Sequence, residues 1–310
     1  MSQTLIAAMK HALVNSERIS FRSKEAHYAS GNLTCLRDQY WSFTGVPETN
    51  KTDTVGAMKM LVGNAVEKEL ISAVFYKMQQ AGWHVLSTQT KIGEDSPHWH
   101  GLLDIFMSRK VGEETFKFVV EIKTKSGYGA DLFYAKPEPS PEYMTQIGLY
   151  LRRLSQEDIC NGLFIYVLLS DKHFGTIISV SCFYDKEKDV VYATNYERSD
   201  GSTGSLNVEL DLAKAAKRWE VLDQHIKDKT VPKPEYSYKY ELTPEKLGSL
   251  SDAMLKKIID GVAIGGDWQP LYSRYKDLQL STDKINQERS PEEKALCKAE
   301  YRKRHPRSKI

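Results

Sequence analysis

The sequence predicts an α/β (α+β) protein in which a central mixed β-sheet is flanked by helices. Two observations lead to this prediction. Apolar residues recur at helical spacing over residues 56–81, and residues 141–154 are also predicted to be a helix. Between and after these helices come apolar or alternating runs that are typical of strands. We expect strands at residues 83–92, 99–108, 115–125, 162–170, 176–184 and 190–196. Elements in this order pack as a sheet with helices on its faces.

Local residue types support the individual elements. Gly82 follows the first helix at the place where a helix commonly stops, and Pro141 begins the second, where a missing N–H costs little. A turn at 111–114 joins the strands at 99–108 and 115–125 into a hairpin. The uninterrupted apolar run at 162–170 indicates a strand covered on both faces.

We predict that the chain is organised in three regions. Residues 1–55 form an N-terminal segment with a short helix at 3–15 and irregular structure from 20 to 54. Residues 56–200 form the sheet-containing core. Residues 201–310 form a C-terminal helical region with a basic tail; it begins with an amphipathic helix at 207–227 and an extended linker at 228–240, where Pro232 and Pro234 oppose helix.

The composition excludes several classes of protein. The chain has 310 residues, a formal charge of +2, 41% hydrophobic and 27% charged residues, as in ordinary soluble proteins. We find neither a run of ~20 apolar residues for a membrane span nor the apolar core of a signal peptide. The four cysteines form no CxxC or Cys/His cluster, which excludes a zinc finger. We therefore expect a protein of the reducing cytoplasm, in a bacterial or phage-infected cell.

Three ionisable residues on neighbouring strands form the candidate site. Glu121 and Lys123 are two apart on one strand and so share a face, and Asp104 lies on the strand that pairs with it. Two carboxylates close together repel and favour a divalent cation between them. Oxygen ligands favour Mg²⁺ or Mn²⁺. A metal with an ammonium beside it suits phosphodiester hydrolysis. Alone, however, such a Glu-x-Lys pair is most often a solvated ion pair of little value.

Four short motifs occur in order around these residues. They are Gly63 to Glu67 (G-x-x-x-E), Gly101 to Asp104 (G-x-x-D), Glu121-x-Lys123, and Gln146 to Tyr150 (Q-x-x-x-Y). Together with their placement on helices and strands, they resemble the PD-(D/E)xK nuclease superfamily, and within it the RecB-type branch of recombination, CRISPR-adaptation and phage exonucleases. The resemblance implies a restriction-endonuclease-like core over residues 56–200.

The resemblance also assigns roles to individual residues. It implies catalytic roles for Asp104, Glu121, Lys123, Gln146 and Tyr150, and metal ligation by Glu67, Asp104, Glu121 and the Ile122 carbonyl. Without it, Glu67 would be interpreted as a surface residue. Gln146 and Tyr150, four apart on one helix face, would be interpreted as equally suited to packing and to function.

The sequence departs from part of that branch in its cysteines. Some members hold a 4Fe–4S cluster with one early cysteine and a late trio. Cys35 occupies a place similar to the early cysteine, but the late region, 233–242, offers Tyr236, Tyr238 and Tyr240 instead. We therefore predict no 4Fe–4S cluster and suggest that aromatic packing holds this region together.

Cations near the motifs suggest where DNA would bind. Lys125, Arg152 and Arg153 adjoin the motifs, and the last ten residues, 301–310, are strongly basic. Helix-terminal charge placement and a frayed terminus are the alternative interpretations. No GKS or GKT phosphate loop is present, so the chain encodes no nucleotide-driven motor.

The sequence thus favours a Mg²⁺- or Mn²⁺-dependent deoxyribonuclease; the resemblance implies an exonuclease of recombination, repair or phage DNA processing. Two alternatives stay open, namely a sequence-specific endonuclease on the same fold and a catalytically weak nucleic-acid-binding subunit. DNA, double- or single-stranded, is the expected partner. A single-strand annealing protein, a helicase and a second copy of the chain remain open as further partners.

Overall fold

The computed structural model describes residues 26–50, 53–95, 98–267, 269–286 and 288–307. The chain divides into two compact units. The first, called the sheet unit here, comprises residues up to Thr34 and Asp53–Thr230. The second, the helical unit, comprises Cys35–Thr52 and the residues from Val231 onward. The predicted helix at 3–15 lies outside the described residues.

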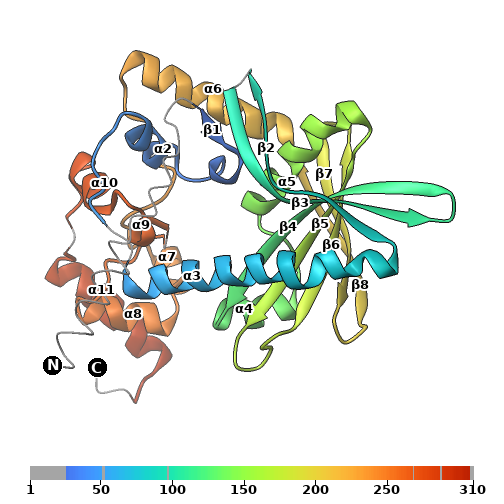
Figure 1. The fold of residues 1–310 in the computed structure, drawn as a ribbon. Coiled ribbons are helices and arrows are strands. Elements are labelled where there is room, and N and C mark those ends of the chain that lie inside the picture. Colours follow the sequence, from blue (N-terminus) through green and yellow to red (C-terminus); the bar gives the residue numbers. More distant parts are fainter. Residues whose placement is uncertain (1–25, 51–52, 96–97, 268, 287, 308–310) are drawn as a thin grey trace, which may run out of the picture. The chain divides into compact units, whose positions relative to one another are not determined.

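One mixed sheet of eight strands forms the sheet unit (Figure 1). Its strand order is β1-β3-β4-β5-β6-β7-β8, with β2 paired to β3. The pairs β1–β3 and β4–β5 are parallel and all other pairs are antiparallel. The strands are β1 (His27–Tyr28), β2 (Trp83–Asp95), β3 (His98–Val111), β4 (Glu114–Ser126), β5 (Asn161–Leu169), β6 (Ile177–Asp185), β7 (Val190–Arg198) and β8 (Thr203–Asp211). The predicted fold class, a mixed sheet flanked by helices, is confirmed.

Helical segments cover the sheet. They are η1 (Ala29–Gly31), α3 (Thr54–Glu69), the π-helix η2 (Leu70–Val74), the 3₁₀-helix η3 (Phe75–Ala81), α4 (Tyr128–Ala135), α5 (Pro141–Leu154), η4 (Ser155–Glu157) and α6 (Leu212–Asp228). Helix α5 is amphipathic, with all residues from Met144 to Leu151 buried. It packs into the main apolar core together with side chains of β5, β6 and β7. A second apolar cluster joins Phe75 of η3 to Ile105, Val120 and Ile122 of β3 and β4.

Two predicted elements differ from the structure. Residues 207–211 belong to strand β8 and not to the amphipathic helix, which begins at Leu212. The boundary predicted at residue 200 therefore falls inside the sheet unit, because β8 and α6 are both part of it. The helix predicted at 56–81 is α-helical only to Glu69, and its apolar residues Met60 and Leu61 are exposed.

The helical unit contains α2 (Leu36–Phe43), α7 (Pro244–Ser249), α8 (Asp252–Ile259), α9 (Gln269–Tyr272), α10 (Lys276–Thr282) and α11 (Pro291–Arg304). Tyr40 and Trp41 are buried on α2, although the sequence predicted irregular structure there. Arg37 donates to the Pro232 carbonyl at 2.8 Å and to Asp283 at 2.6 Å, which ties α2 to the later segments. The segment predicted as an extended linker has no helix or strand from Thr230 to Thr243.

The basic tail is partly engaged inside the helical unit. Arg304 pairs with Glu300 at 2.9 Å and with Asp252 at 3.0 Å, and donates to the carbonyls of Leu247 and Leu250. This guanidinium caps neighbouring helices and is not the unpaired phosphate contact that the sequence suggested. No helix in the described part of the chain is long and apolar enough to cross a bilayer.

Candidate active site

The site lies where strands β3 and β4 stop pairing. The last paired residues are Ile105 and Val120. Beyond them Asp104 uses its carboxylate in place of a backbone carbonyl, because Oδ2 accepts a hydrogen bond from the Ile122 N–H at 2.8 Å. Farther along β3, strand β1 takes over this edge at Trp99 and His100. The backbone of residues 101–104 therefore has no strand partner on the side of β4. The Asp104 side chain can contact neighbouring residues there.

Glu121 and Lys123 form a buried pair beside that edge. Glu121 is 0% exposed, and its Oε2 accepts a hydrogen bond from Lys123 Nζ at 2.9 Å. Lys123 Nζ also donates to Gln146 Oε1 at 3.1 Å and lies 5.0 Å from the centroid of the Tyr143 ring. The alternation predicted for this strand thus brings the acid and the ammonium to one face, against helix α5.

Helix α5 completes a chain of hydrogen bonds into the site. Gln146 Nε2 donates to Glu121 Oε2 at 3.0 Å and to the Tyr150 hydroxyl at 3.1 Å. The Tyr150 hydroxyl donates to the Leu102 carbonyl at 3.2 Å, which satisfies the free edge of β3. A Cβ at Gly101 would overlap the Tyr150 ring, 2.8 Å from Cζ, so this position needs glycine. The structure therefore gives physical reasons for the Q-x-x-x-Y spacing and for the glycine before Asp104.

Helix α3 supplies the third carboxylate from the other side. A Cβ at Gly63 would lie 3.2 Å from Thr124 Oγ1, so glycine allows α3 to approach β4 closely. Glu67 follows one turn later, and its pKa is raised first by burial and then by the charge of Asp104. A groove of about 320 Å³ lies between these elements. It is lined by Lys59, Met60, Gly63, Asn64, Glu67, Ile122, Lys123, Thr124 and Tyr143.

The carboxyl groups of the site all hold protons more tightly than usual. The pKa of Glu121 is raised to about 8, mainly by burial; the Lys123 charge opposes this rise and the Asp104 charge adds to it. Burial likewise raises the pKa of Asp104 and of Glu67. Burial would lower the pKa of Lys123, but the Glu121 and Asp104 carboxylates outweigh it and raise that pKa. One ammonium is thus opposed to three acids, a charge balance that favours an additional cation.

The residues present fit a hard divalent cation. Glu121 Oε1 is buried and accepts no hydrogen bond, so a lone pair in the interior lacks a partner. The Asp104 and Glu67 carboxyl groups interact electrostatically with Glu121, and their oxygens are the ligand type that Mg²⁺ and Mn²⁺ prefer. Among the described residues, no three side chains of His, Cys, Asp or Glu lie close enough to form a finished metal shell. Glu67 Oε1 accepts a hydrogen bond from Gln89 Nε2 at 2.7 Å.

The sequence did not indicate Gln89. It lies on β2, between Thr88 and Thr90, which pair with Ile105 and Leu103, so it is opposite Asp104. Its φ of 49° is in the left-handed region, which non-glycine residues seldom adopt inside a strand. A glutamine in a polar strand carries no sequence signal of a special role, and only its register and backbone conformation distinguish it.

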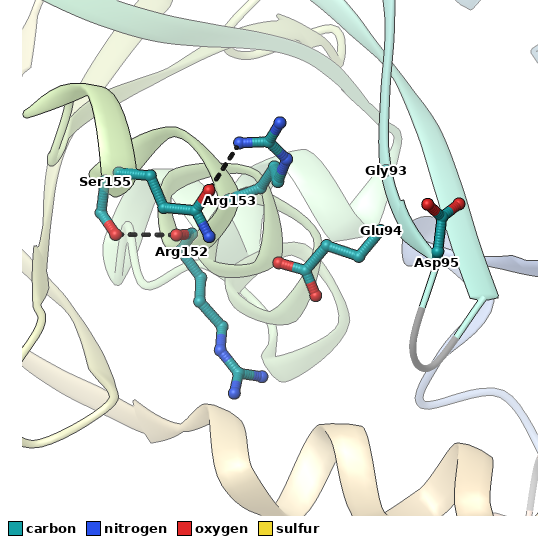
Figure 2. Close-up of a pocket in the computed structure, with 7 residues that line it drawn as sticks. Gly93, Glu94, Asp95, Arg152, Arg153 and Ser155 are labelled. Atoms are coloured by element: carbon teal, nitrogen blue, oxygen red, sulfur yellow. Dashed lines mark hydrogen bonds between the residues drawn. The ribbon is translucent and has the colours of Figure 1, made fainter.

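The three cations predicted for DNA binding lie in two different places. Lys125 is on the same face of β4 as Lys123 and contacts the rings of Tyr143 and Phe133, at 4.8 and 5.7 Å. Arg152 and Arg153 instead line a separate groove of about 600 Å³ at the end of α5 (Figure 2). Its other lining residues are Gly93, Glu94, Asp95, Ser155 and Gln156.

Both arginines that line the second groove have hydrogen-bonding or ionic partners. Arg152 pairs with Asp189 at 3.3 Å, and Arg153 donates to Gln156 at 3.1 Å. The acids Glu94 and Asp95 border the same groove, which reduces its attraction for phosphate. The structure therefore separates these two arginines from Lys123, although the sequence grouped them with it.

The four cysteines are free thiols and are divided between the units. Cys35 and Cys297 are in the helical unit, and Cys160 and Cys182 are in the sheet unit. Tyr238, from the tyrosine-rich segment, is buried within the helical unit near Cys35, whose thiol adds to the burial that raises the Tyr238 pKa. The tyrosine segment therefore contributes a buried aromatic side chain close to the early cysteine.

Comparison with known proteins gives similarity to solved structures only. No family model matches the sequence, and no curated protein matches it significantly. The crystal structure of SSO0001 is similar at 14% identity and a TM-score of 0.37, over 72% of this chain and 88% of that chain. The alkaline exonuclease LHK-Exo from Laribacter hongkongensis is similar at 13% identity and a TM-score of 0.39, over 69% of this chain and 94% of that one. Its complex with dAMP gives 14% identity, a TM-score of 0.37, and 69% and 95% coverage. At this level of similarity, the function has to be inferred from the residues of the chain itself.

Proposed function

We propose that the protein is a Mg²⁺- or Mn²⁺-dependent deoxyribonuclease that hydrolyses phosphodiester bonds. The observation that supports this most strongly is the buried arrangement of Asp104, Glu121 and Lys123. Glu121 has an interior oxygen with no hydrogen-bond partner, and Lys123 is bonded to its other oxygen. Burying acids beside one another destabilises the folded protein. A metal site that acts on phosphodiesters would explain why the protein contains this arrangement.

The residues of the chain divide the chemistry between them. Glu67, Asp104, Glu121 and the Ile122 carbonyl would hold the ion, which when bound would polarise the phosphate and lower the pKa of a water molecule. Lys123 keeps its proton near neutral pH, because two carboxylates raise its pKa. Its ammonium is placed to stabilise negative charge on the phosphate oxygens as the transition state forms. Gln146 and Tyr150 fix the orientation of Glu121 and Lys123 and do not themselves need to titrate.

We further infer that the substrate strand follows the groove between α3 and β4 toward Lys125. Lys125 is half-buried, and among the described residues no hydrogen bond or ion pair engages its ammonium, which lies over aromatic rings. A phosphate next to the scissile one would satisfy this charge. We propose an exonuclease acting in recombination, repair or phage DNA processing; an annealing protein, a helicase or a second copy of the chain would then act with it.

A digestion panel tests the proposal. Linear duplex, single-stranded and closed circular DNA are each incubated with Mg²⁺, with Mn²⁺ or with chelator. We expect progressive loss of linear DNA with either metal, an intact circle, and no cutting in chelator. Discrete fragments from the circle would indicate the sequence-specific endonuclease. DNA binding without cutting under any condition would indicate the catalytically weak binding subunit.

A further inference from the structure

Gln89 has an unusual backbone conformation next to the site. Five non-glycine residues in the described structure have positive φ. Four of them lie at helix ends or in turns, where the left-handed region is common: Asp158, Asp189, Lys229 and Lys284. Gln89 alone among these five lies inside a strand. A left-handed conformation is unfavourable for a residue with a Cβ. Strain of this kind persists where the surrounding structure or a function requires it.

The Gln89 side chain connects two of the acids. Its Nε2 donates to Glu67 Oε1 at 2.7 Å. The same side chain lowers the pKa of Asp104 by hydrogen bonding, although burial raises that pKa overall. Glu67 belongs to a helix, α3, in which no residue is buried, so packing does little to fix its position. The amide of Gln89 is therefore the contact that holds Glu67 toward Asp104.

We propose that Gln89 is a positioning residue of the metal site: its amide holds one oxygen of Glu67 so that the other oxygen faces the cation shared with Asp104. The inference rests on the proposed function in so far as the site takes a divalent ion. Glu67 Oε1 is bonded to the amide, which leaves Oε2 for an ion. Outer contacts of this kind orient metal ligands, and losing one typically lowers metal affinity by about 10–100-fold.

The strained backbone allows a second test, on stability, that distinguishes a positioning residue from a structural one. Glycine adopts positive φ without a Cβ clash, and asparagine does so more readily than glutamine. Gln89→Gly and Gln89→Asn should therefore leave the melting temperature in chelator unchanged or higher. Neither variant can place an amide on Glu67, since glycine lacks one and asparagine is one carbon shorter. Stability and metal affinity should thus move in different directions.

The test measures binding of Mn²⁺ alone, by calorimetry and by electron paramagnetic resonance, on the full chain. We expect Gln89→Gly and Gln89→Asn to bind Mn²⁺ roughly ten-fold or more weakly than the wild type. Gln224→Gly is the matched control, because Gln224 is also an exposed glutamine that donates to a carboxylate, Asp228 at 2.7 Å, far along the chain on α6. The control should leave Mn²⁺ affinity unchanged.

Unchanged Mn²⁺ affinity in both Gln89 variants would overturn the proposal. Two other results would also overturn it. The first is a lower melting temperature in chelator for both variants, which would indicate a structural role. The second is a wild-type protein that binds no Mn²⁺. Cleavage of DNA is assayed separately. A wild-type protein that binds Mn²⁺ but cuts nothing would refute the nuclease function and leave the role of Gln89 standing on the binding data.

Discussion

The two helices that border the site, α5 and α3, differ in how they are held. Helix α5 is buried from Met144 to Leu151, and its polar residues in that run, such as Gln146 and Tyr150, are hydrogen-bonded into the site. Helix α3 has no buried residue, and Glu67 is held by one hydrogen bond to an exposed glutamine. The comparison indicates that the α5 side holds Glu121 and Lys123 through buried contacts, whereas the α3 side holds Glu67 less firmly.

Loss of the Lys123 ammonium, which contacts helix α5 from strand β4, should have the largest effect. Lys123→Ala removes the cation that would stabilise the phosphate in the transition state, so we expect the cleavage rate to fall by about 10²–10³-fold. The fold should be retained, because the burial-raised pKa lets Glu121 take up a proton in its place. Single-turnover cleavage rates and far-UV circular dichroism check this. Full activity in the variant would remove Lys123 from the mechanism.

A pair of leucine substitutions tests the packing difference directly. Leu149 on α5 is 1% exposed and Leu61 on α3 is 43% exposed. We expect Leu149→Ala to lower the free energy of unfolding by about 2–5 kcal/mol and Leu61→Ala to change it by less than about 0.5 kcal/mol. Urea denaturation measures both. A cost above about 2 kcal/mol for Leu61→Ala would show that α3 is packed as tightly as α5, against the comparison.

Substitution of Lys125 should weaken DNA binding moderately. Lys125→Met removes a phosphate contact and keeps the apolar stem against Tyr143 and Phe133. We expect roughly ten-fold weaker binding and a salt dependence reduced by about one phosphate contact, with Lys125→Arg retaining most of the affinity.

Fluorescence anisotropy across a salt series, on a labelled phosphorothioate oligonucleotide with Ca²⁺, measures these changes. Lys186→Met is the control, because that lysine is paired with Asp158 at 2.9 Å beyond the other end of β5. An equal loss in the Lys125 and Lys186 variants would contradict a specific contact.

The last prediction concerns pH and the ion-free protein. Burial raises the Glu121 pKa from its usual 4.5 to about 8 in the folded chain. The folded state therefore binds a proton that the unfolded state has lost, and stability falls as pH rises from about 4.5 to 8. Melting temperatures in chelator between pH 5 and 9 should decline more for the wild type than for Glu121→Gln. Parallel declines would show that Glu121 does not carry this effect.

Much of the site follows from local rules that a sequence displays. Alternation along a strand places Glu121 and Lys123 on one face, and a spacing of four on a helix does the same for Gln146 and Tyr150. The structure brings these residues together with Asp104. The sequence also placed the helix at 141–154 with the bounds that α5 has. These features depend on neighbours a few residues apart.

The features that were missed depend on register and burial. Gln89 is brought opposite Asp104 by the register in which β2 pairs with β3, it has a left-handed conformation there, and it contacts Glu67. Residues 207–211 of strand β8 were assigned to the following helix, although Leu206, Val208 and Leu210 alternate as strand residues do. Arg152 and Arg153 line a groove with Glu94 and Asp95 of β2, a different groove from that of Lys123, and this arrangement depends on contacts between segments far apart in the sequence.

The central claim is that buried carboxylates and one ammonium form a metal-dependent phosphodiesterase site. Chelation and rescue test it most directly, with linear DNA, the wild type and Asp104→Asn. We predict that the wild type cuts with Mg²⁺, stops when the ion is chelated and resumes when Mn²⁺ is added in excess, while Asp104→Asn stays inactive under the same conditions. Cutting that persists in chelator, or equal activity in Asp104→Asn, would contradict the claim.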